Sequence, residues 1–419
     1  MNRIKNMLTA ASLLCGIVLL FAFTNNSFAP ASNHDWPQWR GPNRDGRSAE
    51  TGILKTWPVE GPKVLWRVPL ASGFSAVTVA NGKAYTMFSN DVDELVLCVE
   101  ANTGKELWRF KSDRNYVERQ GGDGPRATPL VDGKLVYTIG AYGKLYALNA
   151  DNGKKVWEHD LQKEYEGKMP IWGITATPMT EGNMLLVDVG GKNGFALMAF
   201  DKNNGKVIWN SHTDQPGYSA PIAATVGGVR QIIFFTGANL VGVAPNDGKV
   251  FWSQPWQTQF FVNAATPVLI PGDKVFISSG YDQGAGLFQL LASNGRASAQ
   301  SVWLNKNMRN HMATSVYHEG HLYGFDEANL KCLDVATGED KWKTRGLGKG
   351  SLMYADGHFI VLSERGKLLL VEATPSGYVE KASAQILRGK CWTMPTLANG
   401  KLYLRNEKEM VCLDLKASL

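Results

Sequence analysis

Hydrophobic and polar residues follow a repeated pattern along most of this chain. Five windows of 11 residues begin with a small residue, carry Gly at position seven and end in Trp. Apolar alternation in each window predicts β-strands, and Asp, Asn or Thr before the Gly predicts a tight turn in which Gly has a positive φ. Each terminal Trp is predicted to dock between neighbouring units, because the small first residue leaves room for it. The windows are Cys98–Trp108, Ala147–Trp157, Ala199–Trp209, Gly242–Trp252 and Cys332–Trp342.

A second recurring piece precedes these windows. It is a short strand with residues such as Ala-Thr-Pro, followed by a turn such as Asp132-Gly133, and eight copies of it occur along the chain. Trp66 and Trp303 extend the Trp series, in which successive residues are separated by 42, 49, 52, 43, 51 and 39 positions. A period of about 40–50 residues is typical of propeller blades with four strands. The pattern therefore predicts an all-β fold, an eight-bladed β-propeller of four-stranded antiparallel blades.

The two ends of the repeat are complementary. The eighth unit stops near Leu415 before any Gly turn or Trp strand, whereas Lys63–Trp66 forms a spare Trp strand with no unit in front of it. Pairing of these N- and C-terminal strands would close the ring and remove two open sheet edges. The seventh unit is irregular, because it keeps Gly377 but has Lys381 where Trp is expected. We expect one propeller domain over residues 61–419.

The start of the chain has the pattern of a secretory leader. Two basic residues precede an apolar run that ends at Phe23, and Ala29-Pro30-Ala31 matches the small-x-small cleavage pattern. Cleavage before Ser32 makes residues 1–31 a signal peptide and residues 32–60 an N-terminal extension. We therefore expect an exported, periplasmic protein with no membrane span after cleavage of the leader.

Composition narrows the classes of function. The net charge is +6, and two of the positive charges lie in the leader, so the mature chain is too weakly basic to indicate nucleic-acid binding. Neither Cys-x-x-Cys-His nor His-Glu-x-x-His occurs, which excludes a covalently attached c-type haem and that type of zinc site. Cys98, Cys332 and Cys412 occupy the small first position of a unit, so we interpret them as core residues rather than disulfide partners.

These motifs carry a resemblance to a known family. The repeated small-x-Asp-x-x-Thr-Gly-Lys-x-x-Trp pattern, which follows Ser/Thr-Pro strands, resembles the repeat of the pyrroloquinoline-quinone (PQQ) propeller superfamily. The segment Asp35–Gly46 (DWPQWRGPNRDG) also resembles the start of exported PQQ-like repeat proteins, some of them polyvinyl-alcohol-dehydrogenase-like. The superfamily contains quinoprotein alcohol dehydrogenases and also non-catalytic members of the BamB type. The resemblance implies the propeller fold, but a fold alone does not imply an activity.

A candidate site is predicted where the long loops meet. In a propeller, the loops that lead from one blade to the next gather on one face, around the mouth of the central channel. Alignment of the eight inner strands places cations, an imidazole, an amide and aromatic rings at this mouth, a combination that suits a planar anionic ligand. A solvated channel mouth whose aromatic residues cover the core is the alternative. The candidate ligand-binding residues are Arg126, Tyr218, Asn263, His311, Lys349 and Trp392.

The resemblance also implies what a catalytic member requires. Such a member has an adjacent Cys-Cys pair beside the cofactor, a Ca²⁺ held by Glu, Asn and Asp, and an Asp that acts as base. This chain has no Cys-Cys, and Cys391-Trp392 is the nearest approach to one. No acidic pair falls at the aligned mouth positions, so a hard cation would lack the charge that it requires. We expect no catalytic and no metal-binding residue, and PQQ with Ca²⁺ is the cofactor pair that the resemblance implies for an enzyme.

Two functions remain open. The first is an exported binding or scaffold module without activity, whose partner is a protein, a small molecule or a polymer at the long-loop face. Aromatic loop residues such as Trp256, Phe260 and Phe261 favour a partner surface, although packing over their own blade explains them equally well. The alternative is a PQQ-dependent dehydrogenase that oxidises an alcohol or a sugar.

Overall fold

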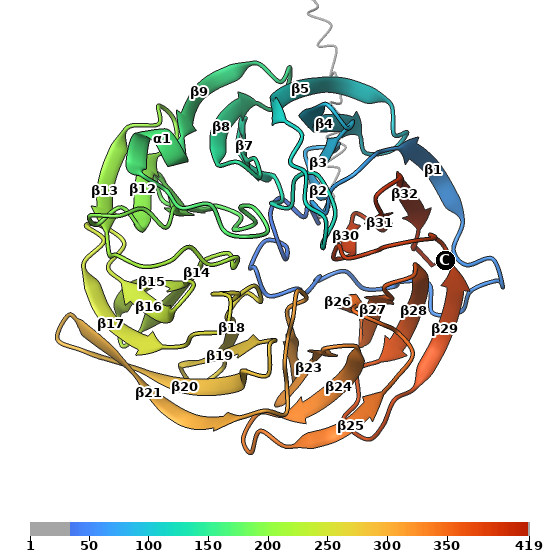
Figure 1. Ribbon diagram of the computed structural model, residues 1–419. Helices are drawn as coiled ribbons and strands as arrows, with labels where there is room; N and C mark the ends of the chain where they lie inside the picture. The colour runs from blue at the N-terminus through green and yellow to red at the C-terminus, as the bar shows by residue number, and fades with distance from the viewer. Residues whose placement is uncertain (1–33, 418–419) are drawn as a thin grey trace, which may run out of the picture. The chain divides into compact units, whose positions relative to one another are not determined.

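The repeat folds into a ring of sheets. A computed structural model describes residues 34–417, which form eight four-stranded sheets arranged around a common centre (Figure 1). All neighbouring strands within the sheets are antiparallel, so the predicted eight-bladed propeller is confirmed. The predicted signal peptide, residues 1–31, lies outside the described residues.

The first four blades follow one another along the chain. Blade 1 contains β2 (Thr78–Ala80), β3 (Lys83–Ser89), β4 (Asp93–Glu100) and β5 (Glu106–Arg114). Blade 2 contains β6 (Leu130–Asp132), β7 (Leu135–Ile139), β8 (Lys144–Asn149) and β9 (Lys155–Asp160). Blade 3 contains β10 (Met179–Glu181), β11 (Met184–Asp188), β12 (Leu197–Asp201) and β13 (Val207–Ser211). Blade 4 contains β14 (Ile222–Val226), β15 (Val229–Phe235), β16 (Asn239–Val243) and β17 (Val250–Pro255).

The last four blades complete the circle. Blade 5 contains β18 (Val268–Ile270), β19 (Lys274–Ser279), β20 (Gly284–Ser293) and β21 (Arg296–Asn305). Blade 6 contains β22 (Val316–His318), β23 (His321–Asp326), β24 (Asn329–Asp334) and β25 (Asp340–Thr344). Blade 7 contains β26 (Ser351–Ala355), β27 (His358–Leu362), β28 (Lys367–Glu372) and β29 (Glu380–Gln385). Blade 8 contains β30 (Thr396–Ala398), β31 (Lys401–Arg405), β32 (Glu409–Asp414) and, from the other end, β1 (Val64–Pro69).

Ring closure occurs as the sequence predicts. Strand β1 pairs antiparallel with β32, with Trp66 opposite Cys412 and Val68 opposite Met410. Because β1 supplies the outer strand that the C-terminal unit lacks, blade 8 has the same four-stranded order as the others.

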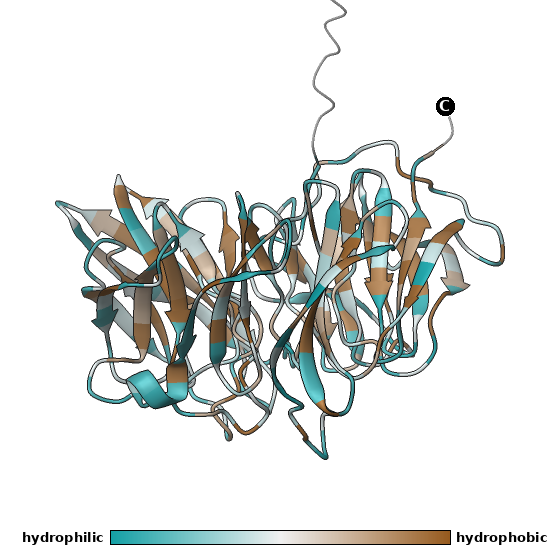
Figure 2. Ribbon diagram, turned by 90° about the horizontal axis from the view of Figure 1, so that it is seen from above, coloured by the Kyte–Doolittle hydropathy of each residue, from teal (hydrophilic) through white to brown (hydrophobic). Residues whose placement is uncertain are grey.

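Successive strands run between two faces of the ring. The loops that lead from one blade to the next lie at the long-loop face, and turns such as Asn81-Gly82 lie at the opposite, short-turn face. Apolar residues are concentrated in the strands between the two faces (Figure 2). The helix α1 (Leu161–Tyr165) follows β9. Within residues 34–417, no helix is long and apolar enough to cross a membrane.

Recurring positions of the repeat join neighbouring blades. Trp108 of blade 1 is buried and donates a hydrogen bond from Nε1 to the Ala150 carbonyl of blade 2, 3.1 Å away. It also covers Gly153, whose φ is 69° and where an added Cβ would lie 2.6 Å from the indole. The turn Gly therefore has two roles, a left-handed backbone and close contact with the preceding blade. The same pairing of indole, carbonyl and Gly recurs at Trp66, Trp157, Trp209 and Trp303.

Three units depart from this arrangement. The long hairpin of β20 and β21 displaces the turn of blade 5, and Trp252 bonds instead to Gln231 of its own blade at 2.7 Å. Trp342 is partly exposed and donates to the Thr374 carbonyl of blade 7. In blade 7, Ala382 and not Lys381 lies at the register position of the Trp. The prediction for Lys381 was wrong because the turn before β29 is longer than in the other units.

The centre of the ring is filled by the chain itself. Residues 35–54, which we call the axial insert, run across the middle of the ring (Figure 1) and form isolated bridges to blades 1 and 7, Trp36 with Val79 and Arg47 with Tyr354. A third bridge joins Ile53 to Lys416. The axial insert is thus an integral part of the ring rather than an appendage.

Two buried arginines fasten the axial insert. Arg44 donates to the carbonyl oxygens of Pro178 in blade 3 and of Pro221 in blade 4, the latter at 2.9 Å. Arg40 donates to the carbonyl oxygens of Thr314 at 3.3 Å and Ser315 at 2.9 Å. Burial lowers the pKa of Arg40 to about 10 and that of Arg44 to about 9, so both remain charged at neutral pH.

Candidate functional site

A cavity of about 640 Å³ opens at the centre of the long-loop face. We call it the axial cavity. Inner strands and loops of several blades form its wall, and Trp39 of the axial insert also lines it. The Trp39 indole is fixed by a hydrogen bond of 2.9 Å to Thr266 Oγ1. Because the insert fills the centre of the ring behind the cavity, a ligand has access from the long-loop face.

The structure brings five of the six predicted site residues together around this cavity. They come from blades far apart in the sequence, which the alignment of inner strands anticipated. Whether they bind a ligand stays a prediction. The five residues are Arg126, Tyr218, His311, Lys349 and Trp392.

Asn263 is placed differently from the prediction. Its side chain is fully buried and does not line the cavity. The amide donates to the carbonyl oxygens of Thr236, Gly237 and Trp256, and its oxygen accepts a hydrogen bond of 2.7 Å from Ser279. Asn263 therefore fixes the loop after β17, since all of its strong hydrogen-bonding capacity is used within the fold.

Arg126 supplies a cation at the wall of the cavity. Its guanidinium donates to the carbonyl oxygens of Gly122 and Gly124 and lies 4.9 Å from the ring centre of Tyr116 and 5.7 Å from that of Phe74. Burial lowers the pKa of Arg126, and nearby Tyr116 and Glu118 partly offset this effect. The aromatic and carbonyl contacts orient the charge without neutralising it.

Lys349 and His311 form a second polar element. The Lys349 ammonium lies 3.4 Å from His311 Nδ1. Burial and the neighbouring Lys349 lower the pKa of His311 to about 4, so the imidazole is neutral at pH 7. An ammonium can only donate, which assigns the His311 proton to Nε2. Both groups thus act as donors.

Aromatic rings form the remaining wall. The Trp172 ring lies 6.4 Å from Tyr281 in a stacked arrangement and 6.3 Å from Tyr218, between ring centres. The Phe260 and Tyr281 rings pack edge to face with their centres 5.6 Å apart, and the centres of the Phe74 and Trp392 rings are 5.4 Å apart. Such surfaces favour a flat, conjugated ligand.

Glu364 holds two sides of the cavity in place. One carboxylate oxygen accepts a hydrogen bond of 3.0 Å from the Trp392 indole, and the other accepts one of 3.3 Å from the Lys349 backbone. Glu364 does not itself line the cavity. It therefore sets the orientation of Trp392 relative to Lys349.

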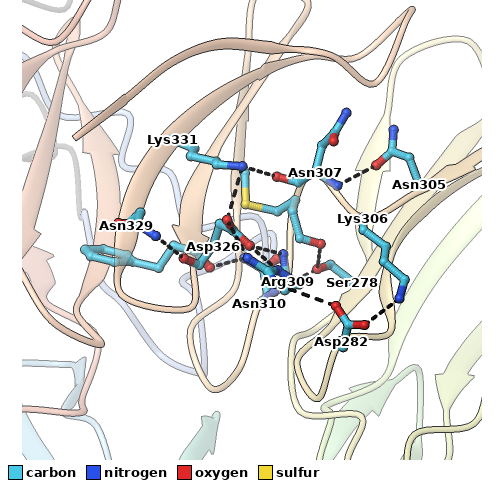
Figure 3. Close-up of polar contacts among 12 residues, drawn as sticks. Ser278, Asp282, Asn305, Lys306, Asn307, Arg309, Asn310, Asp326, Asn329 and Lys331 are labelled. Carbon is cyan, nitrogen blue, oxygen red and sulfur yellow. Dashed lines mark hydrogen bonds and ion pairs between the residues drawn. The ribbon is translucent and has the colours of Figure 1, made fainter. Parts of the chain in front are cut away.

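A network of ion pairs supports the loop that carries His311. Arg309 pairs with Asp326 at 2.8 Å and with Asp282 at 3.6 Å, and Asp326 also pairs with Lys331 at 3.1 Å (Figure 3). Lys331 in turn donates to the Asn307 carbonyl at 2.7 Å. Because these contacts tie the loop after β21 to blade 6, the adjoining His311 has a fixed position.

The sequence analysis missed several residues of the cavity. Trp172, Phe260 and Tyr281 come from loops whose course the repeat does not specify, and Trp39 comes from the extension before the repeat. Trp256, considered with Phe260 as a partner surface, is buried, and its indole donates a hydrogen bond of 3.1 Å to Ser279 of β19 in the neighbouring blade 5. The aromatic richness of the loops was the available signal for the three wall residues.

The donor set does not fit a calcium-dependent quinone centre. No Asp or Glu lines the axial cavity. Among residues 34–417 no cluster of three His, Cys, Asp or Glu side chains is arranged to hold a metal ion. Cys391, beside Trp392, is fully buried and has no adjacent Cys. The cavity can accommodate a planar anion, but it lacks the carboxylates that Ca²⁺ requires.

Comparison with known proteins gives one family match. The sequence profile of the family described as "Outer membrane protein assembly factor BamB" matches residues 92–344, which is more than half of the chain. No curated protein shows a significant sequence match to the chain.

Solved structures share the fold at low sequence identity. BamB from Moraxella catarrhalis has a TM-score of 0.61 and 14% identity, and the match covers 84% of this chain and 99% of that one. Quinohemoprotein alcohol dehydrogenase from Pseudomonas putida HK5 has a TM-score of 0.64 and 12% identity, and the match covers 92% of this chain and 81% of the enzyme. The corresponding enzyme from Comamonas testosteroni has a TM-score of 0.53 and 11% identity, also with 92% and 81% covered. From the profile match and the eight-bladed ring it follows that the chain belongs to the BamB-type family of PQQ-like β-propellers.

Proposed function

We propose that this protein is an exported propeller that binds a planar, conjugated anion in its axial cavity without oxidising a substrate. The observation that carries the proposal is the lining of the cavity. Arg126 and Lys349 provide cations and His311 provides a neutral donor, whereas no carboxylate lines the same wall. Aromatic faces beside these donors suit a flat ligand whose edge carries oxygen acceptors.

The alternative, a PQQ-dependent dehydrogenase, has less support. It would need carboxylates for Ca²⁺ and an acidic base within reach of the substrate, and the cavity wall offers neither. Structural likeness to quinohemoprotein alcohol dehydrogenases at 12% identity concerns the fold.

A scaffold role at the same face is compatible with ligand binding. Exposed apolar side chains lie in the loops around the cavity: Val117 is 65% exposed and Ile171 is 59% exposed. Apolar residues at the rim are suited to a protein partner. The leader pattern and the family description, an outer membrane assembly factor, support a periplasmic location.

The test is a titration with PQQ, used as a planar tricarboxylate probe, in the absence of Ca²⁺. We expect quenching of tryptophan fluorescence with saturation in the wild type. Arg126→Ala and Trp392→Ala should each weaken binding about tenfold or more, because each removes a charge or a stacking surface. Arg296→Ala, at the exposed tip of the β20–β21 hairpin, is the matched control and should bind like the wild type.

Thermal unfolding of each variant shows whether the ring is intact. Equal affinity of folded Arg126→Ala and wild type, or no binding at high micromolar PQQ, would contradict the proposed ligand class.

A further inference from the structure

A second cavity of about 300 Å³ lies beside the axial cavity, among the loops of blades 3 and 4. Its lining includes Lys168, Lys192 and Asp214, together with the aromatic ring of Phe261. None of these residues lines the axial cavity. The proposed function does not use this second cavity.

Three loops contribute to both cavities. The loop after α1 places Lys168 in the second cavity and Trp172 in the axial one. The loop after β13 does the same with Gln215 and Tyr218. In the loop after β17, Phe260 lines the axial cavity and its neighbour Phe261 lines the second cavity. The second cavity is therefore part of the same loop assembly and has a defined wall.

Close backbone contacts build this wall. An added Cβ at Gly190 would lie 2.5 Å from Pro216, and one at Gly237 would lie 2.8 Å from Gln215 and 3.0 Å from Phe261. Phe261 itself has a φ of 58°, a left-handed conformation that is rare for a bulky residue. Such backbone strain persists only where surrounding contacts enforce it, and it is enriched at ligand sites.

The acidic end of the cavity is a preorganised carboxylate. The Asp214 side chain is 5% exposed and accepts hydrogen bonds from Asn239 at 2.8 Å, from the Gln215 backbone at 2.7 Å and from Thr236. Burial alone would raise the pKa of Asp214, but the nearby His212, 3.7 Å away, and hydrogen bonds from Asn239 and Thr236 lower it overall. A negative charge is thus held in a fixed orientation at the cavity wall.

The basic end consists of two lysines. Lys168 donates to Gln215 Oε1 at 3.1 Å, and Lys192 is exposed at the rim. Within the described part of the chain, neither ammonium forms an ion pair with a carboxylate, so both charges are available to a ligand. The wall of this one cavity therefore carries both positive and negative groups.

We propose that the second cavity binds a small zwitterion, a molecule with an ammonium group and a carboxylate on a short skeleton. The ligand carboxylate meets Lys168 and Lys192, and its ammonium meets Asp214. A simple anion is disfavoured by Asp214, and a simple cation is disfavoured by the two lysines. Matching both ends at once selects the zwitterion.

Ligand-observed saturation-transfer NMR tests this proposal with three probes, L-alanine, acetate and ethylamine. L-Alanine carries both charged groups, acetate carries only the carboxylate, and ethylamine carries only the ammonium. We expect a signal for L-alanine alone. Lys192→Gln should weaken L-alanine binding about tenfold, because it removes a charged hydrogen bond at an exposed position. Asp214→Asn should weaken it to a similar extent.

Lys206→Gln is the matched control, since Lys206 is an exposed lysine of the same blade at the short-turn face. It should leave binding unchanged. Equal signals from L-alanine and acetate would show a simple anion site, and equal signals from L-alanine and ethylamine would show a simple cation site. Either result, absence of L-alanine binding, or unchanged binding in Lys192→Gln overturns the proposal.

Discussion

At the scale of single residues, the contact between a Trp and the turn Gly of the next blade explains why both recur at fixed spacing. Gly153 illustrates it, because its positive φ and its closeness to Trp108 each exclude a side chain. Gly133 of the same blade also has a positive φ, 60°, but nothing lies within 4 Å of its added Cβ. A comparison of these two positions therefore separates the cost of the left-handed backbone from the cost of contact with the indole.

Gly153→Ala should destabilise the protein more than Gly133→Ala. Both substitutions place Ala in a left-handed conformation, at a cost of about 1–2 kcal/mol. Only the first also forces Cβ against the indole, and such overpacking costs roughly 1–3 kcal/mol more. Urea-induced unfolding of both variants measures the difference. Equal costs would show that the indole yields freely and that the contact does not constrain the repeat.

Glu94 should make stability depend on pH. It is fully buried, and its carboxylate accepts hydrogen bonds of 3.1 Å from Ser112 and Ala141. Burial raises the pKa of Glu94 from 4.5 to about 7. Because the folded state binds this proton more tightly than the unfolded state, the stabilisation is complete below pH 4.5 and is lost as the pH rises through 7.

Glu94→Gln should therefore flatten the pH dependence of the unfolding free energy. Through this group, the unfolding free energy of the wild type should fall by up to about 3 kcal/mol between acidic and mildly alkaline pH. The variant should not show this decrease. Part of the slope should persist, since burial also raises the pKa of Asp188 to about 7. Urea unfolding at several pH values provides the measurement, and identical slopes in both proteins would contradict the assignment.

At the scale of elements, the axial insert is the part that the repeat does not explain. Residues 35–54 contribute no strand to the eight sheets, yet their arginines donate to carbonyl oxygens just before the inner strands of blades 3, 4 and 6. The sequence identified it only as an extension, because the carbonyl groups in the blades that its arginines contact lie more than 100 residues away and leave no local pattern. The same reason explains why Trp39 was missed as a cavity residue.

Arg44→Gln should loosen this element. The shorter side chain leaves the buried carbonyl oxygens of Pro178 and Pro221 without their donor, which costs about 1–3 kcal/mol for each unpaired group. Thermal and urea unfolding should show the loss, and PQQ affinity should fall as well, because the insert also carries Trp39. Arg296→Gln, at an exposed hairpin tip, serves as the control. If Arg44→Gln is as stable as the wild type, the hydrogen bonds of Arg44 do not hold the axial insert in the ring.

At the scale of the whole molecule, the ring was predictable because it follows from local turns and from the complementary ends of the repeat. The cavity was predictable only in part. Inner-strand alignment located Arg126, His311 and Lys349, since strand positions repeat from blade to blade. It failed at Asn263, where the loop after β17 turns the side chain into a hydrogen-bonded core position. Loop conformations depend on contacts between blades, which one sequence does not encode locally.

The central claim is that the axial cavity binds a planar anion but does not support dehydrogenation. Dye-linked oxidation of alcohols and sugars by the purified protein, saturated with PQQ and supplied with Ca²⁺, tests it most directly. The account predicts bound PQQ, seen as fluorescence quenching whose affinity falls about tenfold or more in Arg126→Ala, with no turnover above the protein-free blank. PQQ-dependent turnover in the wild type that is lost in Arg126→Ala would contradict it and would establish the protein as a dehydrogenase.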